Sequence, residues 1–219
     1  KALSELRKNG TFKKFIVILN GAIVPQVDFL KDESLAIDSA LWVGGLGQNG
    51  ATAVAKILNG TVNPSGKTTD TLFRDNKLNP VNVNFGPFQF TNEEDFASYK
   101  IPLNQGNNDV LRPAHTSYVV YQEGMYLGYK YTETRYEDYV SNRENVGDFR
   151  YDDVVGYPFG YGLSYTTFDY SDVRVQKNGK TYTLTLTVKN TGEVSGKEAV
   201  EVYISKPYGE YAIKNGIQV

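Results

Sequence analysis

The stretch that decides the fold is Ser39-Ala-Leu-Trp-Val-Gly-Gly-Leu-Gly-Gln-Asn-Gly-Ala-Thr-Ala-Val-Ala-Lys-Ile-Leu58. Its first five residues, 39–43, form a short apolar run that predicts a buried strand. After the glycines, residues 51–58 repeat apolar side chains on one helical face, and Asn59-Gly60 supplies the left-handed stop that ends many helices. The stretch therefore predicts a strand, a tight turn and a helix.

The segment before it extends the same pattern. Phe15-Ile-Val-Ile-Leu19 is continuous and β-branched, which is typical of a strand buried on both faces. A short helix is predicted at Gln26–Leu30. Strands that alternate with helices in this way favour an α/β layer built on parallel strands.

The middle of the chain has weaker periodicity. Turn residues interrupt Asn63–Arg112, so we expect a long irregular segment, of the kind that is functional or wraps another domain. The Tyr-rich residues 118–139 predict a mixture of strand and short helix.

The last fifty residues alternate apolar with polar side chains and predict three antiparallel strands. Asn178-Gly179 predicts the first hairpin turn, and Asn190–Gly192 opens the turn into the third strand. The change of period places a domain boundary near Thr166, between residues 1–165 and 166–219. The three strands contain Val173 and Val175; Leu184, Leu186 and Val188; and Val200, Val202 and Ile204.

Neither half forms a closed architecture by this count. Three strands do not complete a β-sandwich, for which about seven are typical, and two strand-helix units make a narrow sheet. The predicted fold class is α/β: an incomplete α/β sandwich with mainly parallel strands, followed by part of an antiparallel β-sandwich. We expect the missing strands to come from chain outside this sequence, a partner polypeptide or a complementary fragment.

Composition excludes several classes of function. The 23 basic and 25 acidic residues are interspersed and give a net charge of −2, which disfavours nucleic acid as a partner. No apolar run is long enough to span a bilayer. The absence of cysteine excludes disulfides and thiolate metal sites but leaves the compartment open.

Gly45-Leu-Gly-Gln-Asn-Gly50 has the spacing of a dinucleotide-binding loop, and Asp70 lies twenty residues beyond it. In such a loop the acidic residue ends a second buried strand, whereas Asp70 lies in a turn-rich stretch. We therefore favour a tight strand-to-helix turn and expect no cofactor there. Gly66-Lys67-Thr68 resembles the end of a phosphate-binding loop, but its spacing and the preceding helix argue against phosphate.

Other polar residues carry weaker signals. His115 is the single histidine and no nucleophile motif accompanies it, so a surface or hydrogen-bonding role is expected. Glu93-Glu94-Asp95 and Asp152-Asp153 are interpreted as solvated charge rather than metal ligands. Two Asn-Gly-Thr sequons, at Asn9 and Asn59, would matter only in a secreted eukaryotic protein.

Four ordered blocks of sequence lie between Gly47 and Val200. They are Gly47-Gln-Asn-Gly50 with Ala53–Gly60 and Asn63-Pro-Ser-Gly-Lys67; Tyr121-Gln-Glu-Gly-Met-Tyr-Leu-Gly-Tyr-Lys-Tyr131; Tyr157-Pro-Phe-Gly-Tyr-Gly-Leu-Ser-Tyr-Thr-Thr-Phe168; and Val188–Gly192 with Gly196–Val200. Together these blocks resemble family 3 glycoside hydrolases. The differences from that family's usual pattern are Leu46 in place of Pro, Lys130 in place of Arg, and Thr68-Thr-Asp70 in place of Leu-Pro-x.

This resemblance implies part of a retaining β-glycosidase, with a fibronectin III-like domain starting near residue 166. Such enzymes use a carboxylate nucleophile and an acid/base about 5 Å apart. In the family these groups belong to a (β/α)8 barrel and to a segment before the strand matching Phe15–Leu19. No catalytic, cofactor or metal residue is therefore assigned to this chain, Glu123 included, and the isolated chain is expected to be inactive. The alternative is a non-catalytic carbohydrate-binding or scaffolding module.

Finally, Tyr157–Phe168 is expected to form a seam between the α/β layer and the fibronectin-like strands. Pro158, Gly160 and Gly162 would fix a path along which aromatic rings are buried. In this interpretation burial of Phe159, Tyr161 and Phe168 is the larger stabilising term.

Overall fold

The computed structural model describes residues 1–86, 88–92, 94–95, 100–103, 110–113, 117–142 and 146–205. Contacts divide the chain into two compact units. The first comprises Lys1–Arg74 and Arg150–Lys206, and Asp75–Phe149 belongs to the second.

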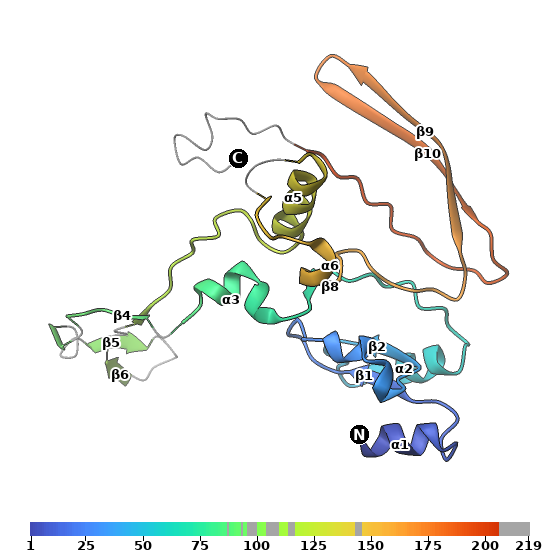
Figure 1. Ribbon diagram of the computed structural model, residues 1–219, viewed down its shortest axis with the longest axis horizontal. Coiled ribbons are helices and arrows are strands. Elements are labelled where there is room, and N and C mark those ends of the chain that lie inside the picture. Colours follow the sequence, from blue (N-terminus) through green and yellow to red (C-terminus); the bar gives the residue numbers. More distant parts are fainter. Residues whose placement is uncertain are drawn as a thin grey trace. The chain divides into compact units, whose positions relative to one another are not determined.

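The predicted strand-turn-helix is present in the first unit (Figure 1). Strand β1 (Ile16–Leu19) pairs in parallel with β2 (Ser39–Trp42), with Ile16 opposite Ser39. Helix α2 (Gly50–Leu58) follows, and helix α1 (Ala2–Lys8) precedes the sheet. Helix α2 ends at Asn59, as expected. The parallel part of the predicted α/β fold is thus confirmed for β1 and β2, and the other described strand pairs are antiparallel.

Two details of this region differ from the prediction. Instead of one α-helix near Gln26–Leu30, two 3-10 turns occur, η1 (Asp28–Lys31) and η2 (Glu33–Leu35). Extended backbone at Asp32 ends the first turn, and the Asp32 side chain accepts the Ser34 N–H to start the second. Each turn is therefore too short to become an α-helix.

Strand β1 is not buried on both faces. Ile16 and Ile18 are 39% and 43% exposed, because the described sheet has two strands and nothing in the described residues covers that face. The run of β-branched residues predicts a strand that is buried on both faces, whereas this two-stranded sheet leaves Ile16 and Ile18 exposed.

The core of the first unit lies around a second small sheet. Strand β3 (Leu72–Phe73) pairs antiparallel with β8 (Val155–Tyr157), which directly follows the short helix α6 (Tyr151–Val154). Phe73 is 1% exposed and Val155 4% exposed. The remaining buried apolar side chains of this unit are Val27, Val54 and Leu72.

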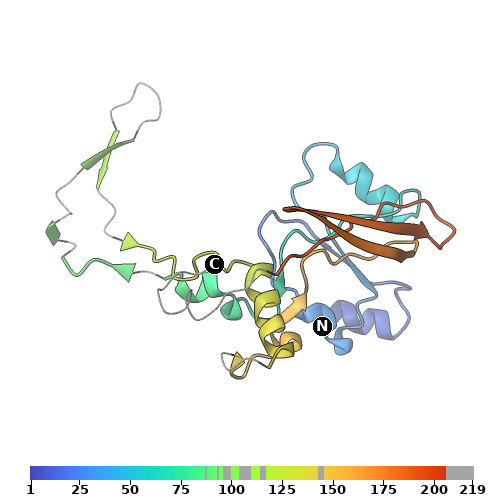
Figure 2. The same ribbon diagram turned by 90° about the horizontal axis from the view of Figure 1, so that it is seen from above.

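The C-terminal hairpin is the longest paired element. Strand β9 (Phe168–Asn178) runs antiparallel to β10 (Thr181–Asn190), and the two lie side by side in Figure 2. The turn is one residue later than predicted, because Asn178 still pairs with Thr181. Gly179 (φ +60°) and Lys180 form the loop, and a left-handed glycine in its first position fits a type II′ turn.

The third predicted strand, at residues 200–204, is wrong. No strand is present in the described residues after Asn190. Instead of pairing with β10, Ser195 and Lys197 bond through their backbones to side chains of the Asn63–Lys67 segment.

The second unit contains the elements that interrupt the predicted irregular segment. They include a 3-10 turn η3 (Asn76–Leu78), helix α3 (Pro80–Asn84) and two antiparallel pairs, β4 (Phe88–Gln89) with β7 (Ser117–Tyr118) and β5 (Lys100–Leu103) with β6 (Val110–Pro113). Helix α5 (Tyr129–Val140) has 12 residues, and Tyr118 at the end of β7 is the one strand residue among the described residues 118–139. The helix predicted for this segment is therefore present but longer than expected, and strand is almost absent from it. No helix in the described part of the chain is both long and apolar enough to cross a membrane.

Candidate functional site: the Asn63 junction

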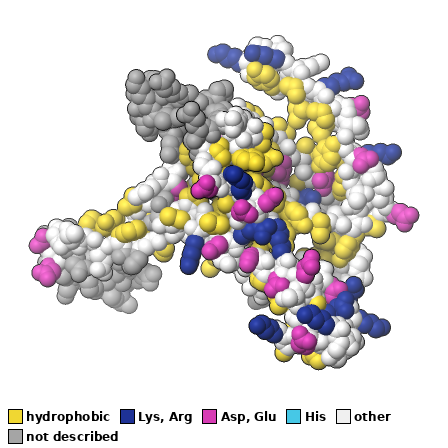
Figure 3. Space-filling view, in the orientation of Figure 1, with side chains coloured by type: hydrophobic (Ala, Val, Ile, Leu, Met, Phe, Trp, Pro, Cys, Tyr) yellow, Lys and Arg dark blue, Asp and Glu magenta, His cyan; other side chains and the backbone are white. Residues whose placement is uncertain are grey.

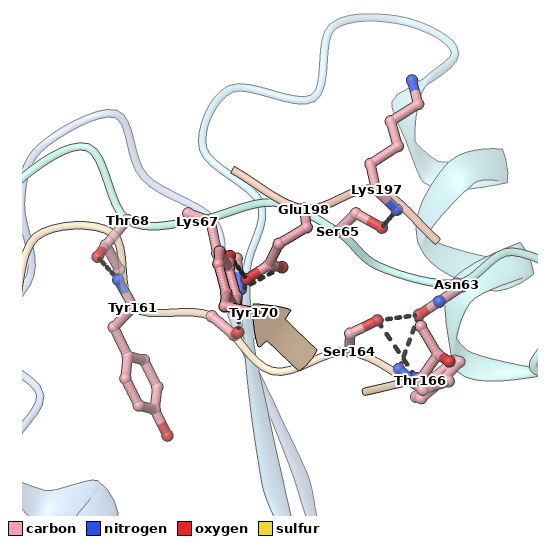
Figure 4. Close-up of polar contacts among 12 residues, drawn as sticks. Asn63, Ser65, Lys67, Thr68, Tyr161, Ser164, Thr166, Tyr170, Lys197 and Glu198 are labelled. Carbon is pink, nitrogen blue, oxygen red and sulfur yellow. Dashed lines mark hydrogen bonds and ion pairs between the residues drawn. The ribbon is translucent and has the colours of Figure 1, made fainter. Parts of the chain in front are cut away.

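Three segments distant in sequence meet around Asn63. We call this site the Asn63 junction; it comprises Asn63–Thr68, Pro158–Thr166 and Ser195–Glu198, all in the first unit (Figure 4). The Asn63 side chain joins all three. Its Oδ1 accepts the Tyr165 N–H at 2.8 Å and the Ser164 hydroxyl at 3.0 Å, while its Nδ2 donates to the Ser195 carbonyl at 3.0 Å.

Thr68 fixes the other end of the same segment. Its Oγ1 donates to the Pro158 carbonyl at 2.7 Å and accepts the Tyr161 N–H at 3.0 Å. Its backbone N–H donates to the Tyr161 carbonyl, and its carbonyl accepts the Gly160 N–H, both at 2.8 Å. Because both the side chain and the backbone of Thr68 form hydrogen bonds with this segment, residues 158–161 are held against Thr68 as a paired strand would be.

A charged pair lies between these two anchors. The Lys67 ammonium donates to the Gly162 carbonyl at 2.8 Å and lies 3.3 Å from Glu198 Oε2. The other Glu198 oxygen accepts the Tyr170 hydroxyl at 2.9 Å. Burial, with Glu198 as the next contributor, raises the pKa of Tyr170 above its ordinary value. The side chains of Lys67 and Glu198 are 19% and 17% exposed, so this pair is better shielded than a surface ion pair.

Close backbone approach also shapes the junction. A Cβ on Gly162 would lie 2.3 Å from the Gly66 carbonyl oxygen, and a Cβ on Gly192 would lie 2.3 Å from Thr166 Oγ1. Thr166 is 7% exposed and donates to Asn190 Oδ1 at 2.7 Å. Glycine is therefore required where the segments touch.

A hollow of about 460 Å³ adjoins the charged pair. Its lining is mixed, with apolar and polar side chains both from the β9–β10 hairpin and from the chain after β10. Hydrophobic side chains are visible at the surface over this hairpin in Figure 3. The polar lining residues are Lys67, Tyr170, Glu198, Glu201 and Tyr203, and the apolar ones are Val173, Leu184, Leu186, Ala199, Val200 and Val202.

The arrangement holds segments in place. Glu198 accepts the Tyr170 hydroxyl and pairs with Lys67, so both charged groups bond to neighbouring segments of the chain. Glu201 likewise accepts the Tyr203 hydroxyl at 2.7 Å. The junction is thus a structural joint between α2, the 158–166 segment and the chain after β10.

The glycine loop forms the tight turn that its sequence favoured. It connects β2 to α2, and Gly44 and Gly47 have φ of +57° and +60°. Asp70 is exposed and precedes β3 rather than ending a buried parallel strand. The structure thus confirms the turn.

The other candidate residues do not belong to the three segments of the junction. Asp152 and Asp153 are exposed in the first turn of α6, and Asn92 donates to Asp95 at 3.2 Å. Glu123 is 8% exposed, hence buried. His115 and Glu93 lie outside the described residues. Within the part of the chain that the structure describes, no cluster of three or more His, Asp or Glu side chains could hold a metal ion.

The seam at residues 157–168 touches both neighbouring regions, but aromatic burial does not dominate it. Tyr161 is 39% exposed, and Phe159 and Phe168 are only partly buried. The residue that is buried is Thr166. The prediction that aromatic burial is the larger stabilising term was therefore wrong. The Thr68 and Asn63 side chains form hydrogen bonds with the backbone of this segment, while its aromatic rings remain partly or largely exposed.

The sequence did not predict that Asn63, Lys67 and Glu198 hold neighbouring segments of the chain together. The blocks that carry the family resemblance include Asn63-Pro-Ser-Gly-Lys67 and Gly196-Lys-Glu198, but the resemblance does not explain why these residue types occur there. A buried Asn needs partners for both its oxygen and its nitrogen, so pairing the two signatures could have identified the joint.

A family comparison agrees with this architecture. The model for the glycosyl hydrolase family 3 C-terminal domain matches residues 2–129. That match covers more than half of the chain, which therefore belongs to glycosyl hydrolase family 3.

Particular relatives sharpen the assignment. The chain is 32% identical over 190 residues to the exo-alpha-(1->6)-L-arabinopyranosidase of Bifidobacterium longum, covering 86% of the chain and 19% of that protein. It is also 32% identical over 215 residues to beta-glucosidase A of Butyrivibrio fibrisolvens, covering 91% and 21%. The chain thus spans about a fifth of the length of these relatives.

Solved structures show the same relationship. A beta-glucosidase from Paenibacillus barengoltzii matches with a TM-score of 0.59 and 27% identity over 89% of this chain and 17% of that one. Beta-glucosidase 3B from Thermotoga neapolitana, solved with alpha-D-glucose, matches with a TM-score of 0.55 and 32% identity over 86% and 20%. The mixed α/β fold class is confirmed.

Proposed function

We propose that this chain is a non-catalytic part of a retaining glycosidase that cleaves β-linked glucosides or oligosaccharides, and that its catalytic carboxylates lie outside the chain. The observation that carries the proposal is the match to glycosidases over 86–91% of the chain but only 19–21% of the relatives. In this assignment a (β/α)8 barrel or complementary fragment supplies the catalytic carboxylates, about 5 Å apart, and this chain supplies none. Residues 166–219 begin a fibronectin III-like domain.

The Asn63 junction supports a structural role for these residues. Its polar atoms are directed at backbone groups of neighbouring segments, and its charged side chains neutralise one another. Such a joint would keep the α/β layer and the fibronectin-like strands in a fixed arrangement. A pocket assembled from several domains depends on that arrangement for its walls.

The experiment compares the intact gene product with the 219-residue chain. Both are assayed with aryl β-glucosides and, because one relative is an arabinopyranosidase, with an aryl α-L-arabinopyranoside. We expect turnover by the intact protein and none by the chain. Turnover by the pure chain would contradict the proposal. An intact protein that binds sugar but hydrolyses neither substrate would favour the carbohydrate-binding or scaffolding alternative.

A further inference from the structure

Five Asn-Gly pairs lie within the described residues, and their asparagines differ in how firmly they are held. The pair Asn-Gly is chemically reactive, because the small glycine allows its backbone nitrogen to reach the side-chain amide carbon of the preceding Asn. The pairs begin at Asn9, Asn20, Asn49, Asn59 and Asn178. Their structures decide which of them can react in the folded protein.

Asn9 and Asn59 are restrained twice. Each accepts a backbone N–H two residues ahead, from Thr11 or Thr61, at 3.0 Å. The nitrogen that would attack is also occupied, since the N–H of Gly10 donates at 3.2 Å and that of Gly60 at 3.0 Å to helix carbonyls. For Asn9 the Thr11 hydroxyl adds a third bond at 2.7 Å.

Asn20 and Asn49 are restrained by their surroundings. Gly21, after Asn20, accepts the Trp42 indole N–H at 2.9 Å, and Leu19, before it, accepts the Val43 N–H at 2.9 Å. Asn49 precedes the first residue of α2, and its carbonyl accepts the Thr52 N–H at 3.2 Å. These bonds restrain the neighbouring backbone, but within the described residues the side chains of Asn20 and Asn49 and the N–H groups of Gly21 and Gly50 have no hydrogen bond.

Asn178 has neither of the two restraints that hold Asn9 and Asn59, although its backbone pairs with Thr181. It is exposed at the end of β9, and within the described residues its side chain has no hydrogen bond. The N–H of Gly179 has no backbone partner there either, because it lies in the two-residue loop. Hairpin ends also open more readily than the strands that they connect.

We propose that Asn178 is a self-modification site, at which folded protein converts Asn-Gly to Asp-Gly or isoaspartyl-Gly faster than at Asn9 and Asn59. The Gly179 nitrogen attacks Cγ of Asn178, a C–N bond forms, and ammonia leaves with the nitrogen of the side chain. Water then opens the resulting cyclic imide at one of its two carbonyls. The balance is one water consumed and one ammonia released, with no oxidation or reduction.

The surrounding charges suit the product. The new carboxylate lies between Lys177 and Lys180, so it gains two nearby positive groups. The isoaspartate product also lengthens the main chain by one carbon next to the loop. Because the loop has only two residues, the Asn178–Thr181 pair cannot then keep its geometry.

The test ages the 219-residue chain at mildly alkaline pH, folded and in denaturant, and follows each Asn-Gly peptide by mass spectrometry. In denaturant the five rates should be similar, since the reacting pair is the same. In folded protein we expect Asn178 to keep most of its unfolded rate while Asn9 and Asn59 slow by a much larger factor. Equal protection at Asn178 and at Asn9 or Asn59 would overturn the proposal.

Matched variants separate the causes. N178Q should abolish conversion at that peptide, because the longer side chain forms the ring poorly, and should leave the other rates unchanged. T11V removes the hydroxyl bond to Asn9 and should raise the rate at Asn9. T61V should leave the rate at Asn59 unchanged, because only the Thr61 backbone binds it. A rise of the same size in both variants would contradict the protection mechanism.

Discussion

The Asn63 junction and the β9–β10 hairpin lie in the same unit but are stabilised in different ways. At the junction a few polar side chains each satisfy several backbone groups, and glycine permits contact between main chains. The hairpin has a long backbone ladder, yet Val173 and Val175 on β9 are 62% and 64% exposed. The junction is therefore held by individual side-chain atoms that bond to the backbone of neighbouring segments. The hairpin is held by its backbone ladder, and the apolar side chains Val173 and Val175 stay largely exposed.

The largest expected effect follows from the closest backbone contact. G162A places a methyl group 2.3 Å from the Gly66 carbonyl oxygen, and a backbone atom cannot move aside as a side-chain tip can. We expect a loss of about 1–3 kcal/mol or more in the free energy of unfolding, measured by denaturant titration. G66A is the control, since its Cβ would meet nothing within 4 Å; an equal loss in both variants would contradict the close-packed junction.

The next effect concerns Asn63. N63A removes three hydrogen bonds and leaves the Tyr165 N–H and the Ser195 carbonyl without this partner. A loss of about 1–3 kcal/mol in the free energy of unfolding is expected. N82A should cost less, because Asn82 makes one exposed bond to a carbonyl six residues away.

A smaller effect is expected at acid pH. The pKa of Asp38 is lowered, first by hydrogen bonds from the Arg7 guanidinium and then by the Phe15 N–H and Lys14. A carboxylate with a depressed folded-state pKa stabilises the fold above its unfolded pKa of about 4, and this stabilisation is lost as the pH falls below that value. R7M should flatten the fall in melting temperature below about pH 4. An unchanged pH profile would mean that the pair contributes nothing to folding.

The smallest effect tests the hairpin. V175T should change the free energy of unfolding of this chain by no more than about 0.5 kcal/mol, because the side chain is largely exposed. In the intact enzyme the same substitution should cost more, since a second sheet would cover this face. Equal small effects in both proteins would leave the fibronectin-like sandwich without support.

Local patterns predicted the elements that depend on nearest neighbours. The strand at Ile16–Leu19, the glycine turn, α2 and the first hairpin follow from β-branched runs, helical spacing and turn residues. The prediction of a third strand at residues 200–204 was wrong. Alternating apolar residues are compatible with a strand, but a strand also needs a neighbouring strand to pair with, and the local sequence does not identify one.

The junction could not be predicted from periodicity. Asn63 contacts Tyr165 and Ser195, which are 102 and 132 residues away. The prediction that aromatic burial is the larger stabilising term in the seam was wrong for the same reason. The contacts of this segment come from hydrogen bonds of the distant residues Thr68 and Asn63, which the aromatic pattern does not predict. The blocks that resemble the family include residues of the Asn63 junction, but the resemblance does not show what these residues do.

Amide hydrogen exchange of the N63A variant is the most direct test of the Asn63 junction. The Tyr165 N–H donates to Asn63 in the native protein, and the Ser195 carbonyl accepts from it. We expect faster exchange at residues 164–166 and 195–197 together, with the β9–β10 ladder unchanged. Unchanged protection in both segments, or loss confined to one of them, would contradict a joint that holds the three segments through one side chain.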